Sequence, residues 1–221
     1  MHNKKYTLGA IMFDDFELLD MYGPLEMWGE IQPEVEIVMV SETSAPVKSY
    51  QGPKTVVDYT FETCPPLDII LIPGGRGTPN TLRNSAMSQF LMDRVPQAEL
   101  TMTVCTGSWT LAALGFLDGR KATSNKGLFE ITELVSPKVE WIPNARWVED
   151  GPFYTSSGVT AGMDMSLAVI SKMFGKDRAE ALANNTEYIW NKDPKIDPFH
   201  QYLNSYPEEI TNPLKAMLTA K

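Results

Sequence analysis

The residues most able to do chemistry surround Cys105, in the stretch LTMTVCTGS. A short apolar run ends at this cysteine, and Thr106, Gly107 and Ser108 then open a helix-like segment. Where a strand turns sharply into a helix, the hinge side chain faces the crevice beyond the strand ends. The free N–H groups and the dipole at the start of the helix favour a thiolate, so we expect Cys105 to have a lowered pKa and to act as a nucleophile. The alternative interpretation is a small, buried, apolar residue.

Two glycines end a second apolar run, LDIILIPGGRG, at residues 67–77. Like Cys105, Gly74 and Gly75 therefore lie at the carboxyl end of a predicted strand. Glycine has no Cβ to obstruct a close approach to its backbone, and an oxyanion site is built from N–H groups. We expect the backbone of Gly74 and Gly75 to line the site beside the thiol.

A nucleophile needs a proton partner, and the sequence restricts the choice. The only histidines, His2 and His200, lie near the N-terminus and in the C-terminal tail, and neither follows a predicted core strand. Asp20, in LLDMYGP just after the first predicted strand, is the better candidate. A carboxyl group held in a crevice near a thiolate should have a raised pKa and could donate a proton. The alternative role for Asp20 is helix capping.

Short apolar strands alternate with helices along the chain, which is typical of a parallel sheet covered by helices on both faces; the predicted fold class is α/β. Hydrophobic runs predict strands at 7–13, 35–42, 67–75 and 100–104, with a hairpin or two short strands in 46–61 and further β-segments in 121–125 and 139–157. Helical spacing predicts helices at 16–28, 85–97, 106–117, 160–174 and 176–190. With no internal repeat and no linker, we predict a single domain over 1–221, with its core at about 7–190 and a C-terminal extension at 191–221.

The composition restricts the partners. Of the 221 residues 43% are hydrophobic and 21% charged, an ordinary globular composition, and the formal net charge is −9. A chain of this charge has no basic stripe to neutralise phosphates, so we predict no nucleic-acid partner. Two cysteines make no disulfide framework, and Cys64, in a proline-rich loop, is interpreted as structural. The N-terminus lacks a signal-peptide pattern and no apolar stretch is long enough to span a membrane, so we predict a cytoplasmic protein without a membrane partner.

Four motifs together resemble those of the DJ-1/PfpI superfamily: FELLDMYGPLEMW, LDIILIPGGRG, VCTGSWTLAALGFLDGRKATS and SSGVTAGMDMSLAVI. They run in the family's order and cover most of the chain. Within the superfamily the likeness is greatest to the isocyanide (isonitrile) hydratase-like branch, whose acidic residue lies in an LD…GP motif and whose nucleophile lies in CTGS. The resemblance implies a flavodoxin-like three-layer sandwich and a homodimer with its site close to the subunit interface.

The resemblance also implies roles for individual residues. It assigns the nucleophile to Cys105 and the neighbouring acid/base to Asp20, and it makes Thr106 a hydrogen-bonding partner in the catalytic site. The backbone amides of Gly75 and Thr106 fall where the family stabilises negative charge. Asn125, in ATSNKG, stands where many relatives carry a histidine, and we expect it at the pocket wall as a substrate-binding residue.

Two departures from the family pattern reduce the number of reactions that we expect the site to catalyse. Peptidase-type relatives carry a histidine directly after the cysteine, where this chain has Thr106, so we expect no peptidase activity. Asn125 in place of a histidine argues against chemistry that needs a Cys–His pair, including glutamine amidotransfer and some glyoxalase-type chemistry. Regulators that share the domain carry a further helix-turn-helix region, for which a chain ending at Lys221 has no room, so we expect no regulator of that type.

The predicted function is covalent catalysis by Cys105 on a small electrophilic substrate, with isocyanide hydration to an N-substituted formamide as the first choice. Asp20 would deliver a proton as a Cys105 thioimidate forms and would then act as the base for water. No ligand cluster with metal spacing occurs in the sequence, and we predict no cofactor. Two alternatives use the same sulfur: a redox-sensing or stress-response protein with an oxidisable Cys105, and glyoxalase or deglycase activity on reactive aldehydes.

Overall fold

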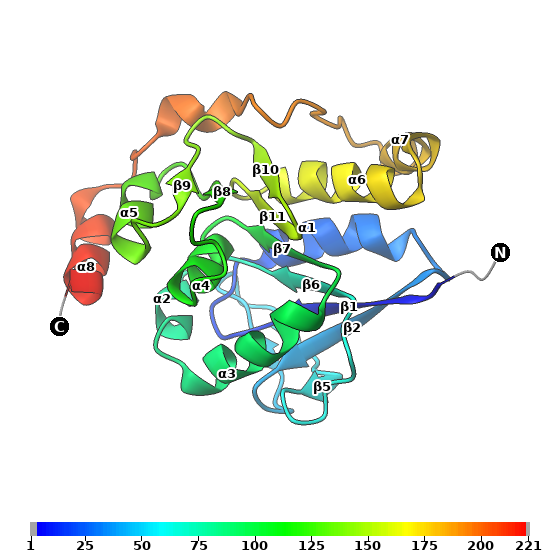
Figure 1. The fold of residues 1–221 in the computed structure, drawn as a ribbon, viewed down its shortest axis with the longest axis horizontal. Coiled ribbons are helices and arrows are strands. Elements are labelled where there is room, and N and C mark those ends of the chain that lie inside the picture. Colours follow the sequence, from blue (N-terminus) through cyan, green and yellow to red (C-terminus); the bar gives the residue numbers. More distant parts are fainter. Residues whose placement is uncertain (1–3, 220–221) are drawn as a thin grey trace.

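A seven-stranded sheet forms the centre of the molecule in the computed structural model, which describes residues 4–219 (Figure 1). Its strand order is β10-β11-β7-β6-β1-β2-β5, and every neighbouring pair except β10 and β11 is parallel. The strands are β1 (Tyr6–Ile11), β2 (Val35–Ser41), β5 (Tyr59–Thr60), β6 (Ile69–Ile72), β7 (Leu100–Val104), β10 (Trp147–Asp150) and β11 (Phe153–Ser156). Two small pairs lie outside this sheet: β3 (Val47–Lys48) with β4 (Lys54–Thr55), and β8 (Lys121–Ala122) with β9 (Glu140–Trp141). The predicted α/β class with a mostly parallel sheet is confirmed.

Helices cover both faces of the sheet and enclose two apolar cores (Figure 1). One face carries α1 (Leu18–Gly29), α6 (Ala161–Phe174) and α7 (Lys176–Asn185); the other carries α3 (Ser85–Arg94) and α4 (Gly107–Ala113). The side chains of β6 alternate between the cores, since Ile69 and Leu71 join the first while Ile70 and Ile72 join the second. All four are fully buried, and each contributes about 1.5–3 kcal/mol by leaving water. The result is the flavodoxin-like three-layer sandwich that the resemblance implied.

Several predicted elements end earlier than the sequence suggested, and the local backbone explains three of these ends. The strand predicted at 67–75 stops at Ile72, because Pro73 has no N–H to continue the ladder. The helix predicted at 106–117 stops at Ala113, and Gly115 then takes a φ of +80°. The helix predicted at 176–190 stops at Asn185, two residues before Glu187, whose φ of +51° is incompatible with a right-handed helix. Within 46–61, the hairpin alternative is confirmed, because β3 and β4 pair antiparallel.

The C-terminal extension, described here as residues 191–219, crosses the surface and ends in a helix that the sequence analysis did not predict. It contains η3 (Pro198–Tyr202) and α8 (Glu208–Thr219), and α8 packs beside α5 (Thr132–Val135) (Figure 1). Arg83 donates a hydrogen bond to the carbonyl of Met217 at 2.9 Å, and Lys215 forms an ion pair with Glu130 at 2.8 Å. The extension is therefore part of the folded unit.

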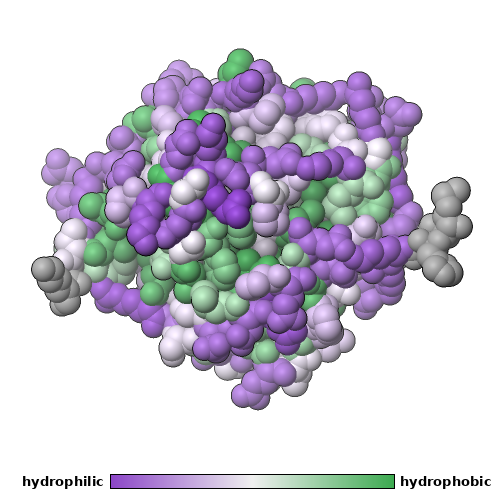
Figure 2. Space-filling view, viewed as in Figure 1, coloured by the Kyte–Doolittle hydropathy of each residue, from purple (hydrophilic) through white to green (hydrophobic). Residues whose placement is uncertain are grey.

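The surface in view is mostly hydrophilic. Figure 2 shows hydrophilic residues over most of this face, with hydrophobic residues gathered toward its middle. Within residues 4–219, no helix combines the length and the apolar character that crossing a membrane requires.

Candidate active site

Cys105 forms a strained hinge between β7 and α4. Its φ is +57°, a left-handed conformation that costs a non-glycine residue about 1–2 kcal/mol. The backbone N–H of Cys105 donates to the carbonyl of Ser156 at 3.1 Å. The hydroxyl groups of Ser108 and Ser124 donate to the carbonyl of Cys105 at 3.1 and 3.0 Å. These contacts hold the thiol at the carboxyl end of β7, where the sequence pattern placed it.

Asp20 lies in the first turn of α1, and its side chain is fully buried. Its Oδ2 accepts a hydrogen bond from the N–H of Gly74 at 3.0 Å, whereas its Oδ1 makes no hydrogen bond of normal geometry to any residue in 4–219. The capping position of α1 belongs to Glu17, and no side chain makes a capping hydrogen bond there. The helix-capping alternative for Asp20 is therefore wrong.

Burial raises the pKa of the Asp20 carboxyl well above its usual range, and the charge of Glu17 raises it further. The hydrogen bond from Gly74 opposes this shift, as does a polar contact with the thiol of Cys105, but both lower the pKa by less than burial raises it. Asp20 therefore keeps its proton to a higher pH than an exposed aspartate does, as the sequence analysis expected.

The prediction of a lowered pKa for Cys105 is wrong. Burial raises the pKa of the thiol well above its ordinary value, and the negative charge of Asp20 raises it further. The N–H of Thr106 and the side-chain amide of Asn125 lower the pKa by smaller amounts. Helix α4 has only seven residues, and its dipole cannot offset the loss of water around a side chain that is 7% exposed. In the resting site, the thiol of Cys105 and the carboxyl group of Asp20 therefore both resist ionisation.

Thr106 connects the glycine loop to the hinge. Its Oγ1 accepts a hydrogen bond from the N–H of Gly75 at 3.1 Å and shares another with the hydroxyl of Thr78 at 2.9 Å. A Cβ on Gly74 would lie 2.6 Å from the backbone nitrogen of Thr106, so this close approach requires glycine. The sequence predicted these glycine amides as an oxyanion site. In the structure they have a different role: the Gly74 amide orients Asp20, and the Gly75 amide orients Thr106.

Asn125, which the sequence analysis placed at the pocket wall, contacts the sulfur of Cys105 directly. Its Nδ2 donates to Sγ of Cys105 at 3.2 Å, and its Oδ1 accepts from the N–H of Leu128 at 3.1 Å, which orients the amide. Gly158, which the sequence analysis did not single out, packs against both groups and leaves room for their contact. A Cβ there would lie 3.0 Å from Sγ of Cys105 and 2.7 Å from Nδ2 of Asn125. Its position in SSGVTAG, after the last strand of the sheet, was the only signal for it in the sequence.

We expect alkylation of Cys105 by iodoacetamide to have its inflection above the pH of an ordinary thiol, which is about 8.5. Asp20→Asn should move the inflection to lower pH, because it removes the negative charge that raises the pKa of Cys105. Asn125→Ala should move it to higher pH, because it removes a donor that stabilises the thiolate. The rates would be followed by mass spectrometry in a Cys64→Ala background. An inflection well below 8.5 would contradict these electrostatics.

The remaining candidate residues lie elsewhere. Cys64 is buried in the second core, and its Sγ donates to the carbonyl of Pro65 at 3.4 Å, in agreement with a structural role. His200 lies in η3 with its Nδ1 3.1 Å from the carbonyl of Pro143, and His2 falls outside the described residues. Within 4–219, no three His, Cys, Asp or Glu side chains group in a way that could hold a metal ion.

The chain belongs to the DJ-1/PfpI family, whose model matches residues 9–172. It is 32% identical over 182 residues to an isonitrile hydratase of Pseudomonas putida, a match that covers 82% of this chain and 78% of that one. It is also 28% identical over 151 residues to the deglycase PfpI of Pyrococcus furiosus, covering 67% of this chain and 86% of that one.

A solved structure is similar over nearly the whole chain. The crystal structure of a THiJ/PfpI family protein from Pseudomonas syringae superposes with a TM-score of 0.82 at 29% identity, covering 98% of this chain and 91% of that one. The likeness in fold therefore extends beyond the residues that the family model matches.

Proposed function

We propose that this chain is a cysteine-dependent enzyme that hydrates small isocyanides to N-substituted formamides. The observation that carries the proposal is the buried pair of Cys105 and Asp20, in which both groups resist ionisation and Asn125 holds the sulfur. The similarity to an isonitrile hydratase supports the choice of substrate.

The first step adds the S–H group of Cys105 across the terminal carbon of the isocyanide. Asp20 delivers its proton to the carbon lone pair, the sulfur bonds to the same carbon, and the thiol proton passes to the Asp20 carboxylate. The product is a thioimidate, Cys105–S–CH=N–R, beside a carboxyl group that is protonated again. We assign this transfer to Oδ1 of Asp20, which has no hydrogen-bond partner among the described residues, whereas Oδ2 accepts a hydrogen bond from Gly74.

Water completes the reaction. It adds to the thioimidate carbon while its proton passes through Asp20 to the nitrogen; the C–S bond then breaks, and the hydroxyl proton of the adduct returns to the sulfur. The sum is one isocyanide and one water giving one formamide, with the enzyme unchanged. This route fits the geometry, because no free pair of glycine amides is needed: an isocyanide carbon becomes protonated as the sulfur adds, so no oxyanion forms in the first step.

The experiment is an NMR assay with a series of alkyl isocyanides. We expect the matching N-alkylformamides to form in the presence of enzyme, with deuterium on the formyl carbon in D₂O and ¹⁸O in the carbonyl when the water is labelled. Absence of formamide above the uncatalysed rate for every isocyanide would overturn the proposal. Methylglyoxal in the same assay tests the aldehyde chemistry for which a related deglycase is named.

The redox-sensor alternative finds less support in the site. A sensor needs an accessible thiol with a low pKa. Cys105 is 7% exposed, and its pKa is raised. The homodimer remains a proposal; Leu19 and Tyr22, on the same helix as Asp20 and each 41% exposed, offer apolar surface to a second copy.

A further inference from the structure

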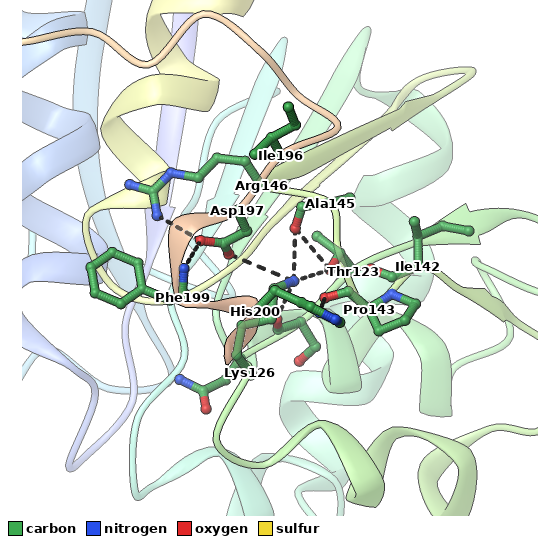
Figure 3. A network of polar contacts seen from close by, with 12 residues as sticks. Thr123, Lys126, Ile142, Pro143, Ala145, Arg146, Ile196, Asp197, Phe199 and His200 are labelled. Carbon is green, nitrogen blue, oxygen red and sulfur yellow. Dashed lines mark hydrogen bonds and ion pairs between the residues drawn. The ribbon is translucent and has the colours of Figure 1, made fainter. Parts of the chain in front are cut away.

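The C-terminal extension is anchored to the segment that carries Asn125. Asp197, fully buried, forms ion pairs with Lys126 at 3.7 Å and with Arg146 at 3.4 Å (Figure 3). In the main chain, the N–H of Asn204 donates to the carbonyl of Lys126 at 2.8 Å. Because Lys126 directly follows Asn125, the extension is fixed to the neighbour of the residue that binds the sulfur.

Tyr206 of the extension lies against the same segment. Its N–H donates to the carbonyl of Gly127 at 3.2 Å. Its ring fills the space that a side chain on Gly127 would need, since a Cβ there would lie 2.8 Å from Cδ1 and 2.9 Å from Cε1 of Tyr206. Gly127 comes two residues after Asn125, whose amide donates to Sγ of Cys105. The ring is thus held close to the site by a contact that only glycine permits.

The charges of the catalytic pair act on the phenol of Tyr206. Burial raises its pKa, the charges of Cys105, Glu17 and Asp20 raise it further, and Arg76 lowers it. Such charges act on the phenol only from nearby, because water and salt screen distant ones. Tyr206 is nevertheless 44% exposed, so part of its ring packs on Gly127 while the rest is open to solvent.

We propose that Tyr206 forms the outer wall of the entrance to Cys105 and determines the size of the N-substituent that the site accepts. The inference rests on the isocyanide hydration proposed above. An isocyanide is linear at nitrogen and must direct its terminal carbon to the sulfur, so its N-substituent points away from the sulfur toward the surface. Tyr206 is partly exposed and packs on Gly127, two residues from Asn125, and this is the side on which the inference places the substituent. A ring at that position admits small or linear substituents and excludes bulky ones.

The test compares two thiol reagents on Cys105 in a Cys64→Ala background: iodoacetamide, which is small, and N-benzylmaleimide, which is bulky. In Tyr206→Ala the rate ratio of the bulky to the small reagent should rise by about tenfold, a change of roughly 1.4 kcal/mol in relative barrier. Tyr206→Phe should keep the original ratio, because the ring remains. Tyr202→Ala is the matched control, since Tyr202 is on the same extension, 54% exposed, and packs on Phe199.

The same variants would be assayed with methyl and cyclohexyl isocyanide. Tyr206→Ala should raise kcat/KM for the cyclohexyl relative to the methyl compound, whereas Tyr202→Ala should leave that ratio unchanged. An unaltered reagent ratio in a folded Tyr206→Ala protein, checked by circular dichroism, would overturn the inference. The alkylation result stands apart from turnover: if no isocyanide reacts in wild type but the reagent ratio rises, the entrance wall is supported and the substrate class is rejected.

Discussion

Cys105→Ala should reduce isocyanide hydration to the uncatalysed rate, because the variant has no atom that can form the thioimidate. Asp20→Asn should lower kcat by about 10²–10⁴-fold, the usual contribution of a general acid. The asparagine amide still offers an oxygen to the N–H of Gly74, so the loop geometry is kept, but it carries no proton acidic enough for the isocyanide carbon. Steady-state production of the formamide measures both effects.

The chain supplies a matched control for this prediction. Cys64 is also a buried thiol with a pKa raised by burial, but it lies in the second core with a hydrogen bond to the carbonyl of Pro65. Cys64→Ala should keep the wild-type kcat. Unchanged turnover in Cys105→Ala, or in Asp20→Asn, would remove that residue from the mechanism.

The rate should also depend on pH in a defined direction. Asp20 acts from its protonated form, so kcat/KM should be flat at low pH and should fall as pH rises through the raised pKa of the carboxyl group. Asp20 loses its proton at a higher pH than an exposed aspartate would. The enzyme should therefore stay active over a wider pH range.

The sheet could be predicted because its strands are short and continuously apolar. LTMTV and IILI are buried along their whole length and contain no charged residue, and the intervening helices show the 3.6-residue period. The extension shows the limit of this reasoning. Helix α8 contains Pro213, and a proline-rich, polar stretch indicates irregular structure when only the local pattern is considered. Its position depends on contacts with Arg83 and Glu130, more than eighty residues away in the sequence.

The residues of the site could be predicted from the sequence, but the direction in which the pKa of Cys105 shifts could not. The turn from strand to helix at Cys105 and the carboxyl of Asp20 follow from local patterns. The direction of the pKa of Cys105 does not, because it depends on burial and on the distance to Asp20, which are tertiary properties. Likewise, the partner of each glycine amide in IPGG is set by residues on α1 and α4, so the sequence could place these amides at the site without showing what they bind.

Asp164→Ala should lower the free energy of unfolding by about 3–5 kcal/mol, the usual effect of removing one partner of a buried ion pair. Asp164, in the first turn of α6, is 1% exposed and accepts from Nε of Arg146 at 2.8 Å. Its other oxygen accepts from the hydroxyl of Tyr188 at 3.0 Å and from the N–H of Asn191 at 2.9 Å. The variant would leave these donors unpaired in the interior and would bring the guanidinium of Arg146 next to a methyl group.

Urea unfolding measures this loss, and a matched pair shows why burial decides its size. The pair of Lys5 and Glu36 has a similar N–O distance, 2.7 Å, but both side chains are more than half exposed, so Glu36→Ala should change stability by only about 0.2–1 kcal/mol. Arg146 also contacts Asp197 at 3.4 Å, so its guanidinium keeps one carboxylate partner in Asp164→Ala. The variant should therefore still fold. Asp164→Asn keeps the acceptor for Asn191 and should fall between the other two variants. If Asp164→Ala and Glu36→Ala were equally stable, water would have to reach the Arg146 guanidinium, and the extension could not be anchored there as a dry, buried network.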